Sequence, residues 1–172
     1  MNPVETVFRG QVITVTVEQA LLPTGASARY EIVHHPGGAA IVAINASNQV
    51  CLLRQYRPAA TGWVWELPAG RLEPEEAPQF TAQRELQEEA GCKAAQWEDL
   101  GSILSSPGVF AETIHLYLAR GLTHSASHHE LYEVMEVHWI DMAVAVQRAL
   151  SGEIRDAKTI IGLLRAWDRG GA

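Results

Sequence analysis

Three glutamates, Glu85, Glu88 and Glu89, fall within five consecutive positions of one polar segment. If the segment is helical, these side chains lie on neighbouring turns, where like charges repel by roughly a few tenths of a kcal/mol per pair. A divalent cation would offset this repulsion, since Mg²⁺ prefers oxygen ligands, usually retains several waters and also contacts phosphates. The spacing therefore predicts a metal site, and the alternative is a solvated acidic helix face.

The segment around the glutamates has the pattern of a short helix with marked ends. Pro78 suits the first helical turn, and Gly91 suits the position just past the last turn. Ala82, Leu86 and Ala90 then form one apolar stripe, which is predicted to face a core. The carboxylates would consequently converge at the edge of the buried surface instead of spreading into solvent.

Two neighbouring features favour the metal site over the solvated face. Arg84 precedes Glu85 and places a fixed cation where it can hydrogen-bond to the carboxylates and orient them. Upstream, Pro68-Ala69-Gly70 is predicted to stop a short strand at residues 63–67 in a tight turn that exposes backbone carbonyls. Carbonyl oxygens are ligands for the same hard cations.

The stretch from Gly70 to Cys92 resembles the Nudix box of the Nudix hydrolases, G-x5-E-x7-R-E-U-x-E-E-x-G-U. Its one departure is Cys92, which stands where an aliphatic residue is usual and where a small apolar side chain is a mild change. The residues that match the motif are Gly70, Glu76, Arg84, Glu85, Leu86, Glu88, Glu89 and Gly91.

The resemblance implies an enzyme that hydrolyses a nucleoside diphosphate linked to another group. Bound Mg²⁺, for which Mn²⁺ can substitute, would neutralise the diphosphate and activate a water. By the same resemblance, Glu85 and Glu89 would bind the metal and take part in catalysis, and Glu88 would bind it directly or through another group. The carbonyl of Ala69 would be a further ligand. The remaining polar positions, Glu76 and Arg84, would orient the loop and the helix.

Segments outside the box resemble those of ADP-ribose pyrophosphatases and related nucleotide-sugar hydrolases. RQYRPAA, followed by WVWELPAG, resembles the strand that leads into their box, where the arginine matching Arg57 contacts the diphosphate. A guanidinium suits this contact because its planar fork binds two oxygens at once. A surface arginine after a strand is the alternative. Arg54, in the same segment, is also predicted to bind substrate.

A second segment with this resemblance is SPGVFAETIHLYLA, whose Pro107 lies sixteen residues after Gly91. Proline at this distance marks the ADP-ribose pyrophosphatase subgroup, although Pro-Gly alone indicates only a turn. The resemblance implies that Pro107 and Glu112 belong to the substrate-binding site. DAKTIIGLLRAW, near the C-terminus, also resembles the closing helix of that subgroup.

The catalytic base of the subgroup lies outside the box, after the strand that matches HLYLA. The corresponding segment here is HHELYEVMEV, whose E-x-x-E-V pattern places Glu133 at the base position, with Glu130 as its rival. The base must reach the attacking water, so geometry decides between them. In the same stretch His124, His128 and His129 are irregularly spaced, which favours a polar loop over a metal site.

Taken together, the resemblance implies hydrolysis of ADP-ribose or a related nucleoside diphosphate sugar to a nucleoside monophosphate and a sugar phosphate. A GDP-mannose or UDP-sugar pyrophosphatase is the alternative, because base selectivity depends on a few loop contacts. A non-catalytic nucleotide-binding Nudix module is a further alternative. That module would be expected to have lost box carboxylates, and here all of them are present.

The elements that must position these residues read as a mixed α/β chain. The resemblance implies the Nudix fold, an α/β/α sandwich with a mixed β-sheet, over residues 39–172. Residues 1–38 are predicted to form a small antiparallel β-appendage, which is too small to bury a core alone. In the ADP-ribose pyrophosphatases that the chain resembles, such strands are exchanged within a homodimer. Strands are expected near 4–17, 28–35, 39–45, 49–56, 63–67, on both sides of Pro107-Gly108 and at 132–140, and closing helices at 141–151 and 156–168.

The composition excludes several function classes. The 172-residue chain has a formal net charge of −7, which argues against nucleic-acid binding and against a polybasic membrane patch. No signal-like N-terminus and no apolar run of about 18 residues are present in the sequence. Cys51 and Cys92 are its only cysteines, a usage typical of reduced proteins, so a cytoplasmic location is expected.

Overall fold

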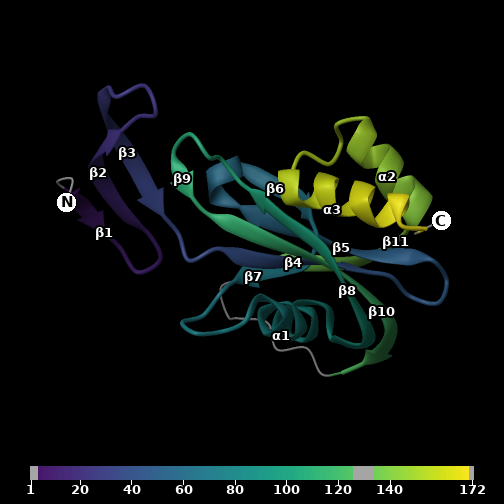
Figure 1. Ribbon diagram of the computed structural model, residues 1–172. Helices are drawn as coiled ribbons and strands as arrows, with labels where there is room; N and C mark the ends of the chain where they lie inside the picture. Colours follow the sequence, from purple (N-terminus) through teal and green to yellow (C-terminus); the bar gives the residue numbers. More distant parts are fainter. Residues whose placement is uncertain (1–3, 126–133, 171–172) are drawn as a thin grey trace.

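The N-terminal strands form a sheet of their own in the computed structural model, which describes residues 4–125 and 134–170 (Figure 1). The first three strands pair antiparallel in sequence order, and the single strand expected near 4–17 is divided into two of them. A short fourth strand, parallel to the third, comes from the later part of the chain, so residues on both sides of the boundary expected after residue 38 share this sheet. The strands are β1 (Val4–Arg9), β2 (Thr14–Leu21), β3 (Ser27–His34) and β9 (Phe110–Ala111).

Two further sheets form the body of the protein. One has the order β7-β4-β10-β8, with β4 and β10 parallel and the other neighbours antiparallel, and the other is antiparallel with the order β11-β5-β6. Their strands are β4 (Gly38–Ala43), β5 (Gln49–Arg57), β6 (Gly62–Glu66), β7 (Ala69–Arg71), β8 (Cys92–Leu104), β10 (Thr113–His124) and β11 (Met135–Asp141). A short 3₁₀ helix, η1 (Pro58–Ala60), links β5 to β6.

Helices cover the sheets from both sides (Figure 1). α1 (Pro78–Ala90) lies on one side, and α2 (Met142–Leu150) and α3 (Ala157–Asp168) lie on the other. The central strand β4 is buried along its whole length, and its alternate side chains enter two separate apolar cores. A strand covered on both faces reads as a continuous apolar run. The predicted mixed α/β sandwich is thus confirmed.

The helices begin and end where their sequences predict. Pro78 opens α1, and Gly91 follows its last turn with a φ of 61°, the left-handed conformation that glycine adopts readily. The side chains of Asp141 and Asp156 cap α2 and α3 by accepting hydrogen bonds from backbone N–H groups of the first turn. Within the described ranges, none of the helices combines the length and the apolar character needed to cross a membrane.

The segment Pro68-Ala69-Gly70 is not the tight turn that the sequence predicts. Its backbone continues as strand β7, which pairs antiparallel with β4 so that Ala69 lies opposite Ala40. The carbonyl of Pro68 accepts a hydrogen bond from the N–H of Ile41 at 2.9 Å. Pairing with the buried strand β4 keeps the segment extended, a long-range contact that the local Pro-Ala-Gly signal does not contain.

Candidate active site

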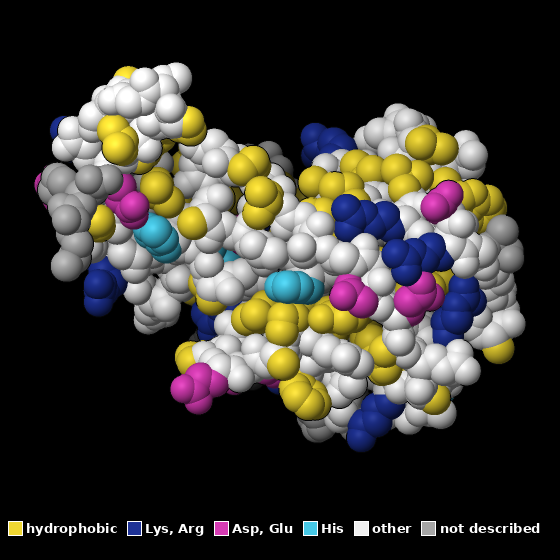
Figure 2. All heavy atoms as spheres, in the orientation of Figure 1, with side chains coloured by type: hydrophobic (Ala, Val, Ile, Leu, Met, Phe, Trp, Pro, Cys, Tyr) yellow, Lys and Arg dark blue, Asp and Glu magenta, His cyan; other side chains and the backbone are white. Residues whose placement is uncertain are grey.

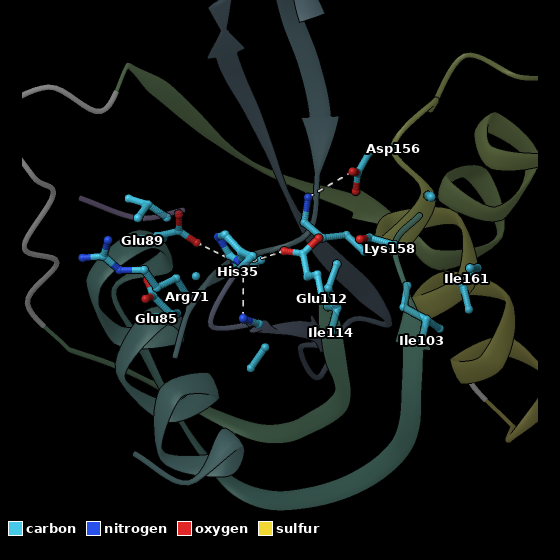
Figure 3. A pocket seen from close by; sticks show the side chains of 18 of the residues that line it. His35, Arg71, Glu85, Glu89, Ile103, Glu112, Ile114, Asp156, Lys158 and Ile161 are labelled. Atoms are coloured by element: carbon cyan, nitrogen blue, oxygen red, sulfur yellow. Dashed lines mark hydrogen bonds and ion pairs between the residues drawn. The ribbon is translucent and has the colours of Figure 1, made fainter. Parts of the chain in front are cut away.

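A cavity of about 860 Å³ opens where the first turns of α3, strand β7 and the buried side of α1 meet (Figure 3). Glu85 and Glu89 lie on one side of it, Lys158 and Asp156 lie toward the other, and His35 and Glu112 lie between them. The cavity gathers eight of the residues singled out from the sequence, which are Arg57, Ala69, Gly70, Arg84, Glu85, Glu88, Glu89 and Glu112.

The two glutamates nearest the core are held against strand β7. Only 9% of Glu85 and 3% of Glu89 is exposed. One carboxylate oxygen of Glu89 accepts a hydrogen bond from the N–H of Ala69 at 2.7 Å. The carboxylate of Glu85 lies over the Cα of Gly70, in the space that a Cβ at that residue would occupy. A side chain at residue 70 would therefore displace the Glu85 carboxylate from its place on β7.

Arg84 connects the carboxylates of the box. Its Nη1 donates to Glu85 at 2.5 Å and to Glu88 at 3.0 Å, and its Nε donates to Glu76 at 3.2 Å. Burial alone would lower the pKa of the Arg84 guanidinium, but its bonds to Glu76 and Glu85 outweigh this and raise the pKa. The Arg84 hydrogen bond in turn lowers the pKa of Glu76. Arg84 and Glu76 are therefore both charged at neutral pH, and the hydrogen bonds of Arg84 hold the carboxylates of Glu76, Glu85 and Glu88 in place.

The donor groups around Arg84 suit a hard divalent cation. Glu85, Glu88 and Glu89 provide oxygen ligands only, which is the set that Mg²⁺ and Mn²⁺ prefer, and Ala69 lines the cavity beside them. In the part of the chain that the structure describes, no three His, Cys, Asp or Glu side chains converge as a ready-made metal site. A metal ion bound here would share the carboxylates of Glu85 and Glu88 with Arg84, which bonds to one oxygen of each.

A second charged group in the cavity is built around Glu66, at the end of β6. Glu66 is 4% exposed and accepts two hydrogen bonds from Arg57, at 2.8 Å from Nε and 3.0 Å from Nη2. Lys158 adds a third at 2.6 Å. The pKa of Arg57 is raised, first by its hydrogen bond to Glu66 and then, less strongly, by the charges of Glu66, Glu89 and Asp156. Arg57 is thus a fixed cation whose charge interacts with Glu66 and Asp156 at one side of the cavity and with Glu89 of α1.

The sequence alone did not single out Glu66 or Lys158. Both lie in segments that resemble the subgroup, WVWELPAG and DAKTIIGLL, but an acidic residue at a strand end and a lysine in a first helical turn are usually exposed. The available signal was the position of Glu66 in an otherwise apolar run before Pro68. A charged residue in such a run must find a partner when it is buried.

His35 is a further cavity residue that the sequence did not indicate. It lies between β3 and β4, and its Nδ1 is 2.8 Å from an oxygen of Glu112 and 3.1 Å from the N atom of Gly37. Glu112, predicted to bind substrate, lies between β9 and β10. The pair therefore connects the N-terminal sheet to the rim of the cavity (Figure 3).

Other candidate residues lie away from the cavity or outside the described residues. Arg54 is on β5, 3.7 Å from Glu136 and with its guanidinium 5.3 Å from the ring centre of Trp63, and it does not line the cavity. Pro107, in the loop between β8 and β9, does not line it either. The described residues include His124 at the end of β10. The remaining candidates, Glu133, Glu130, His128 and His129, lie outside the residues that the structure describes.

Comparison with known families identifies the class to which this fold and site belong. The NUDIX domain family matches residues 33–161, which includes the helix with the glutamates and most of the cavity. The chain therefore belongs to the Nudix family, and it is an enzyme of the Nudix hydrolase type.

Several characterised proteins are similar over most of the chain. A methanol dehydrogenase activator from Bacillus methanolicus is 39% identical over 161 residues, 92% of this chain and 87% of that protein. An ADP-ribose pyrophosphatase from Bacillus subtilis (strain 168) is 36% identical over 157 residues, 90% of this chain and 85% of that protein. A GDP-mannose pyrophosphatase from Salmonella arizonae is 31% identical over 144 residues, 76% of this chain and 73% of that protein.

A solved structure confirms the fold independently. The crystal structure of an ADP compounds hydrolase superposes with a TM-score of 0.80 and covers 98% of this chain and 92% of its own. Its sequence identity of 22% is low, so the agreement is one of architecture.

Proposed function

We propose that this Nudix hydrolase cleaves the diphosphate bond of ADP-ribose or a related nucleoside diphosphate sugar, giving a nucleoside monophosphate and a sugar phosphate. The observation that carries the proposal is the cavity itself, which holds buried carboxylates on one side and the fixed cations Arg57 and Lys158 on the other. A diphosphate needs both, because cations must balance its charge while carboxylates recruit a metal ion.

Each side chain of the cavity has a distinct part in this proposal. Glu85, Glu88 and Glu89, with the Ala69 carbonyl, would hold Mg²⁺, or Mn²⁺ in its place. When bound, the metal supplies charge neutralisation of the diphosphate and lowers the pKa of a bound water. Arg57 donates hydrogen bonds from Nε and Nη2 to Glu66, and its Nη1 would donate to a phosphate oxygen. In the reaction, water adds to phosphorus, the bridging P–O bond breaks, and the phosphate that leaves takes the electron pair of that bond.

The proton of the attacking water would pass to Glu133, with Glu130 as the competing candidate. Replacing a general base by its amide removes the proton acceptor and lowers kcat by roughly 10²-fold to 10⁴-fold. Glu133→Gln is therefore expected to lose turnover, while Glu130→Gln is expected to keep it. The reverse result would assign the role to Glu130. Full activity in both variants would show that the catalytic base is neither of these two glutamates.

The substrate assignment is tested with a panel of possible substrates in the presence of Mg²⁺. ADP-ribose, GDP-mannose, UDP-glucose, NADH, diadenosine polyphosphates and 8-oxo-dGTP would each be assayed for kcat/KM, with the products identified by chromatography. We expect the highest kcat/KM for ADP-ribose, with AMP and ribose 5-phosphate as products. A preference for the intact nucleoside triphosphate would contradict the assignment while leaving the general reaction in place.

GDP-mannose or a UDP-sugar is the second candidate substrate. The similarity to a GDP-mannose pyrophosphatase supports it, as does the chemistry of the cavity, whose charged groups recognise a diphosphate whatever base or sugar it carries. In the same panel, a higher kcat/KM for GDP-mannose than for ADP-ribose would favour this alternative.

The N-terminal sheet is proposed to mediate a homodimer in which residues 1–38 are exchanged between subunits. β1 is exposed along its whole length, and apolar side chains lie on the surface of this sheet (Figure 2). An apolar surface of this kind marks an interaction site. Its exposed apolar residues include Val4, Val7, Phe8, Leu21 and Tyr30.

Light scattering on the eluted protein tests the dimer directly. We expect a dimer at micromolar concentration, and we expect Phe8→Glu to shift it toward the monomer because a charge would have to be buried in the interface. Phe80→Glu is the matched control, since Phe80 is an exposed phenylalanine on α1, outside this sheet. A monomeric wild-type protein would contradict the proposal.

We further propose a cytoplasmic location. Cys51 and Cys92 are buried and free, as expected for a protein of a reducing compartment. Fractionation of cells that express the tagged chain checks this. The soluble cytoplasmic fraction should contain it, and recovery from a secreted or membrane fraction would contradict the proposal.

A further inference from the structure

His35 lies in the connection between β3 and β4, where it lines the cavity beside Glu112 (Figure 3). Its Nδ1 is 2.8 Å from Oε1 of Glu112, and only 19% of the histidine side chain and 18% of the glutamate side chain are exposed. Among the described residues, His35 is the partner that holds this carboxylate. The place of the Glu112 carboxylate in the cavity therefore depends on the histidine.

The backbone on both sides of His35 is held against the segment that carries Glu112. Before it, β3 pairs with β9, and the N–H of Val33 donates to the carbonyl of Val109 at 2.8 Å. After it, Gly37 has a φ of 88°, and a Cβ on this residue would lie 2.6 Å from the carbonyl oxygen of Thr113. The imidazole is thus brought to Glu112 by the packing of the main chain as well as by its own contact.

The Nδ1 of His35 has a second neighbour, the N atom of Gly37 at 3.1 Å. A ring nitrogen donates when it carries a proton and accepts when it does not, so Nδ1 cannot bond to both neighbours at once. The contact with Glu112 is the shorter one, and a bare nitrogen would turn its lone pair toward a negatively charged oxygen. We therefore assign the proton to Nδ1, which makes His35 the donor to Glu112.

We propose that His35 is a positioning residue, whose Nδ1–H fixes one oxygen of Glu112 so that the other oxygen accepts a hydrogen bond from the substrate. This inference rests on the proposed function. A carboxylate repels the oxygens of a diphosphate, so its partner on the substrate is a neutral donor, a hydroxyl or an amino group.

The N-terminal sheet then takes part in shaping the binding site. β3 leads directly into His35, and Val12, in the connection between β1 and β2, also lines the cavity. The position of Glu112 is set by a residue that reaches the cavity from this sheet. We therefore expect a change at His35 to alter substrate binding although the histidine itself does not touch the substrate.

The competing explanation is that His35 only ties the N-terminal sheet to the body of the protein. A purely structural contact affects the free energy of unfolding and leaves KM of the folded enzyme unchanged. A positioning contact raises KM and leaves kcat nearly unchanged, because the Glu112 contact is the same in the ground state and in the transition state.

The test compares variants of His35 by steady-state kinetics with ADP-ribose and Mg²⁺, and by calorimetry with the non-cleavable analogue α,β-methylene-ADP-ribose. His35→Ala removes the donor, and we expect KM and the Kd of the analogue to rise roughly 10-fold, the effect of a lost hydrogen bond to a charged group. His35→Asn places an amide N–H near the position of Nδ1, so it should restore most of the affinity even if its Tm stays low.

His34→Ala is the matched control, because His34 is the preceding histidine, bonds to Thr16 and Glu18 of β2 and does not line the cavity. It should keep the KM of the wild type. A His35→Ala variant with the same KM as His34→Ala would overturn the proposal, as would equal losses in His35→Ala and His35→Asn. Should His35→Ala fail to fold, His35→Leu fills more of the space without a donor, and the same rise in KM is expected.

A double variant shows whether His35 acts through Glu112. Glu112→Ala alone should raise KM at least as much as His35→Ala does. Adding His35→Ala to Glu112→Ala should then raise KM no further, because the group that the histidine positions is already gone. Fully additive effects would contradict the positioning role.

The outcomes also separate this inference from the proposed function. A wild-type enzyme that cleaves no nucleoside diphosphate sugar would contradict the proposed function. A wild-type enzyme that cleaves ADP-ribose, together with a His35→Ala variant of unchanged Kd and KM, would contradict only the role of His35.

Discussion

The carboxylate of Glu85 occupies the place that a side chain on Gly70 would need. Strand β7 and helix α1 therefore approach so closely that Glu85, which we propose as a metal ligand, rests directly on the backbone of the strand before it. This contact explains physically why the motif begins with glycine. It also makes the position of Glu85 depend on residue 70.

Gly70→Ala is expected to damage activity more than stability. The added methyl group would overlap with the Glu85 side chain, which is flexible and can move aside, so overpacking should cost only about 1–3 kcal/mol of the free energy of unfolding. The displaced carboxylate would no longer lie where we propose that it binds the metal, so kcat/KM should fall roughly 100-fold or more. Gly108→Ala is the control, because a Cβ there meets no atom within 4 Å. Wild-type activity in Gly70→Ala would show that the position of Glu85 is not critical.

Glu89→Gln is expected to abolish most turnover while leaving the fold intact. The amide oxygen can still accept the hydrogen bond from Ala69, so the melting temperature should change little. The lost charge should weaken Mg²⁺ binding and reduce kcat by roughly 10²-fold or more. Calorimetry with Mg²⁺ and a steady-state assay measure the two effects. Glu153→Gln, at an exposed glutamate, serves as the control. Full activity in Glu89→Gln would show that Glu89 takes no part in the mechanism.

The stability contribution of Glu66 is expected to disappear in acid. Burial raises the pKa of its carboxyl, but the hydrogen bond from Arg57 and the charge of Lys158 outweigh burial, so the pKa lies below its usual value of 4.5. The unfolded state therefore binds more protons between the two pKa values. The contribution is fully present above about pH 4.5 and is lost as the pH falls through the folded pKa.

Urea unfolding of wild type and Glu66→Gln between pH 7 and pH 3 checks this dependence. The difference in the free energy of unfolding should be largest above pH 4.5 and should shrink below it. The Glu153→Gln control should show no comparable convergence. A wild-type to Glu66→Gln difference that stays constant down to pH 3 would show that the charge of Glu66 is not what stabilises this region.

Thr159→Val is expected to destabilise the junction between α3 and β6. The substitution keeps the shape of the buried side chain but removes the acceptor for the N–H of Leu67 and the donor to Asp156. Leaving the Leu67 N–H unsatisfied should cost about 1–3 kcal/mol, which corresponds to a drop in Tm of roughly 2–4 °C per kcal/mol. Thr123→Val, at an exposed strand position, should leave Tm nearly unchanged. An unchanged Tm in Thr159→Val would refute this role for the hydroxyl.

The sequence predicts the glutamate helix well because its geometry is local. The spacing of Glu85, Glu88 and Glu89 becomes a spatial arrangement as soon as the helix forms, and the end signals Pro78 and Gly91 define its limits. The strands and closing helices follow in the same way from alternation and apolar runs. Local periodicity was therefore enough for the fold class and for one side of the cavity.

The other side of the cavity depends on contacts between distant segments, which local patterns do not encode. Glu66 and Lys158 are 92 residues apart and meet only because α3 packs onto the end of β6. His35 meets Glu112 across two segments in the same way. Pairing with β4 also converts the expected turn at Pro68-Ala69-Gly70 into a strand. These features become visible only when the whole sheet is assembled.

The most direct test of the mechanism is a crystal structure of the protein with Mn²⁺ and α,β-methylene-ADP-ribose, using anomalous scattering to locate the metal. We predict manganese bound by Glu85 and Glu89, with the diphosphate between the metal and Arg57. Manganese located elsewhere, with both carboxylates still bonded only to protein groups and the ligand outside this cavity, would contradict the account.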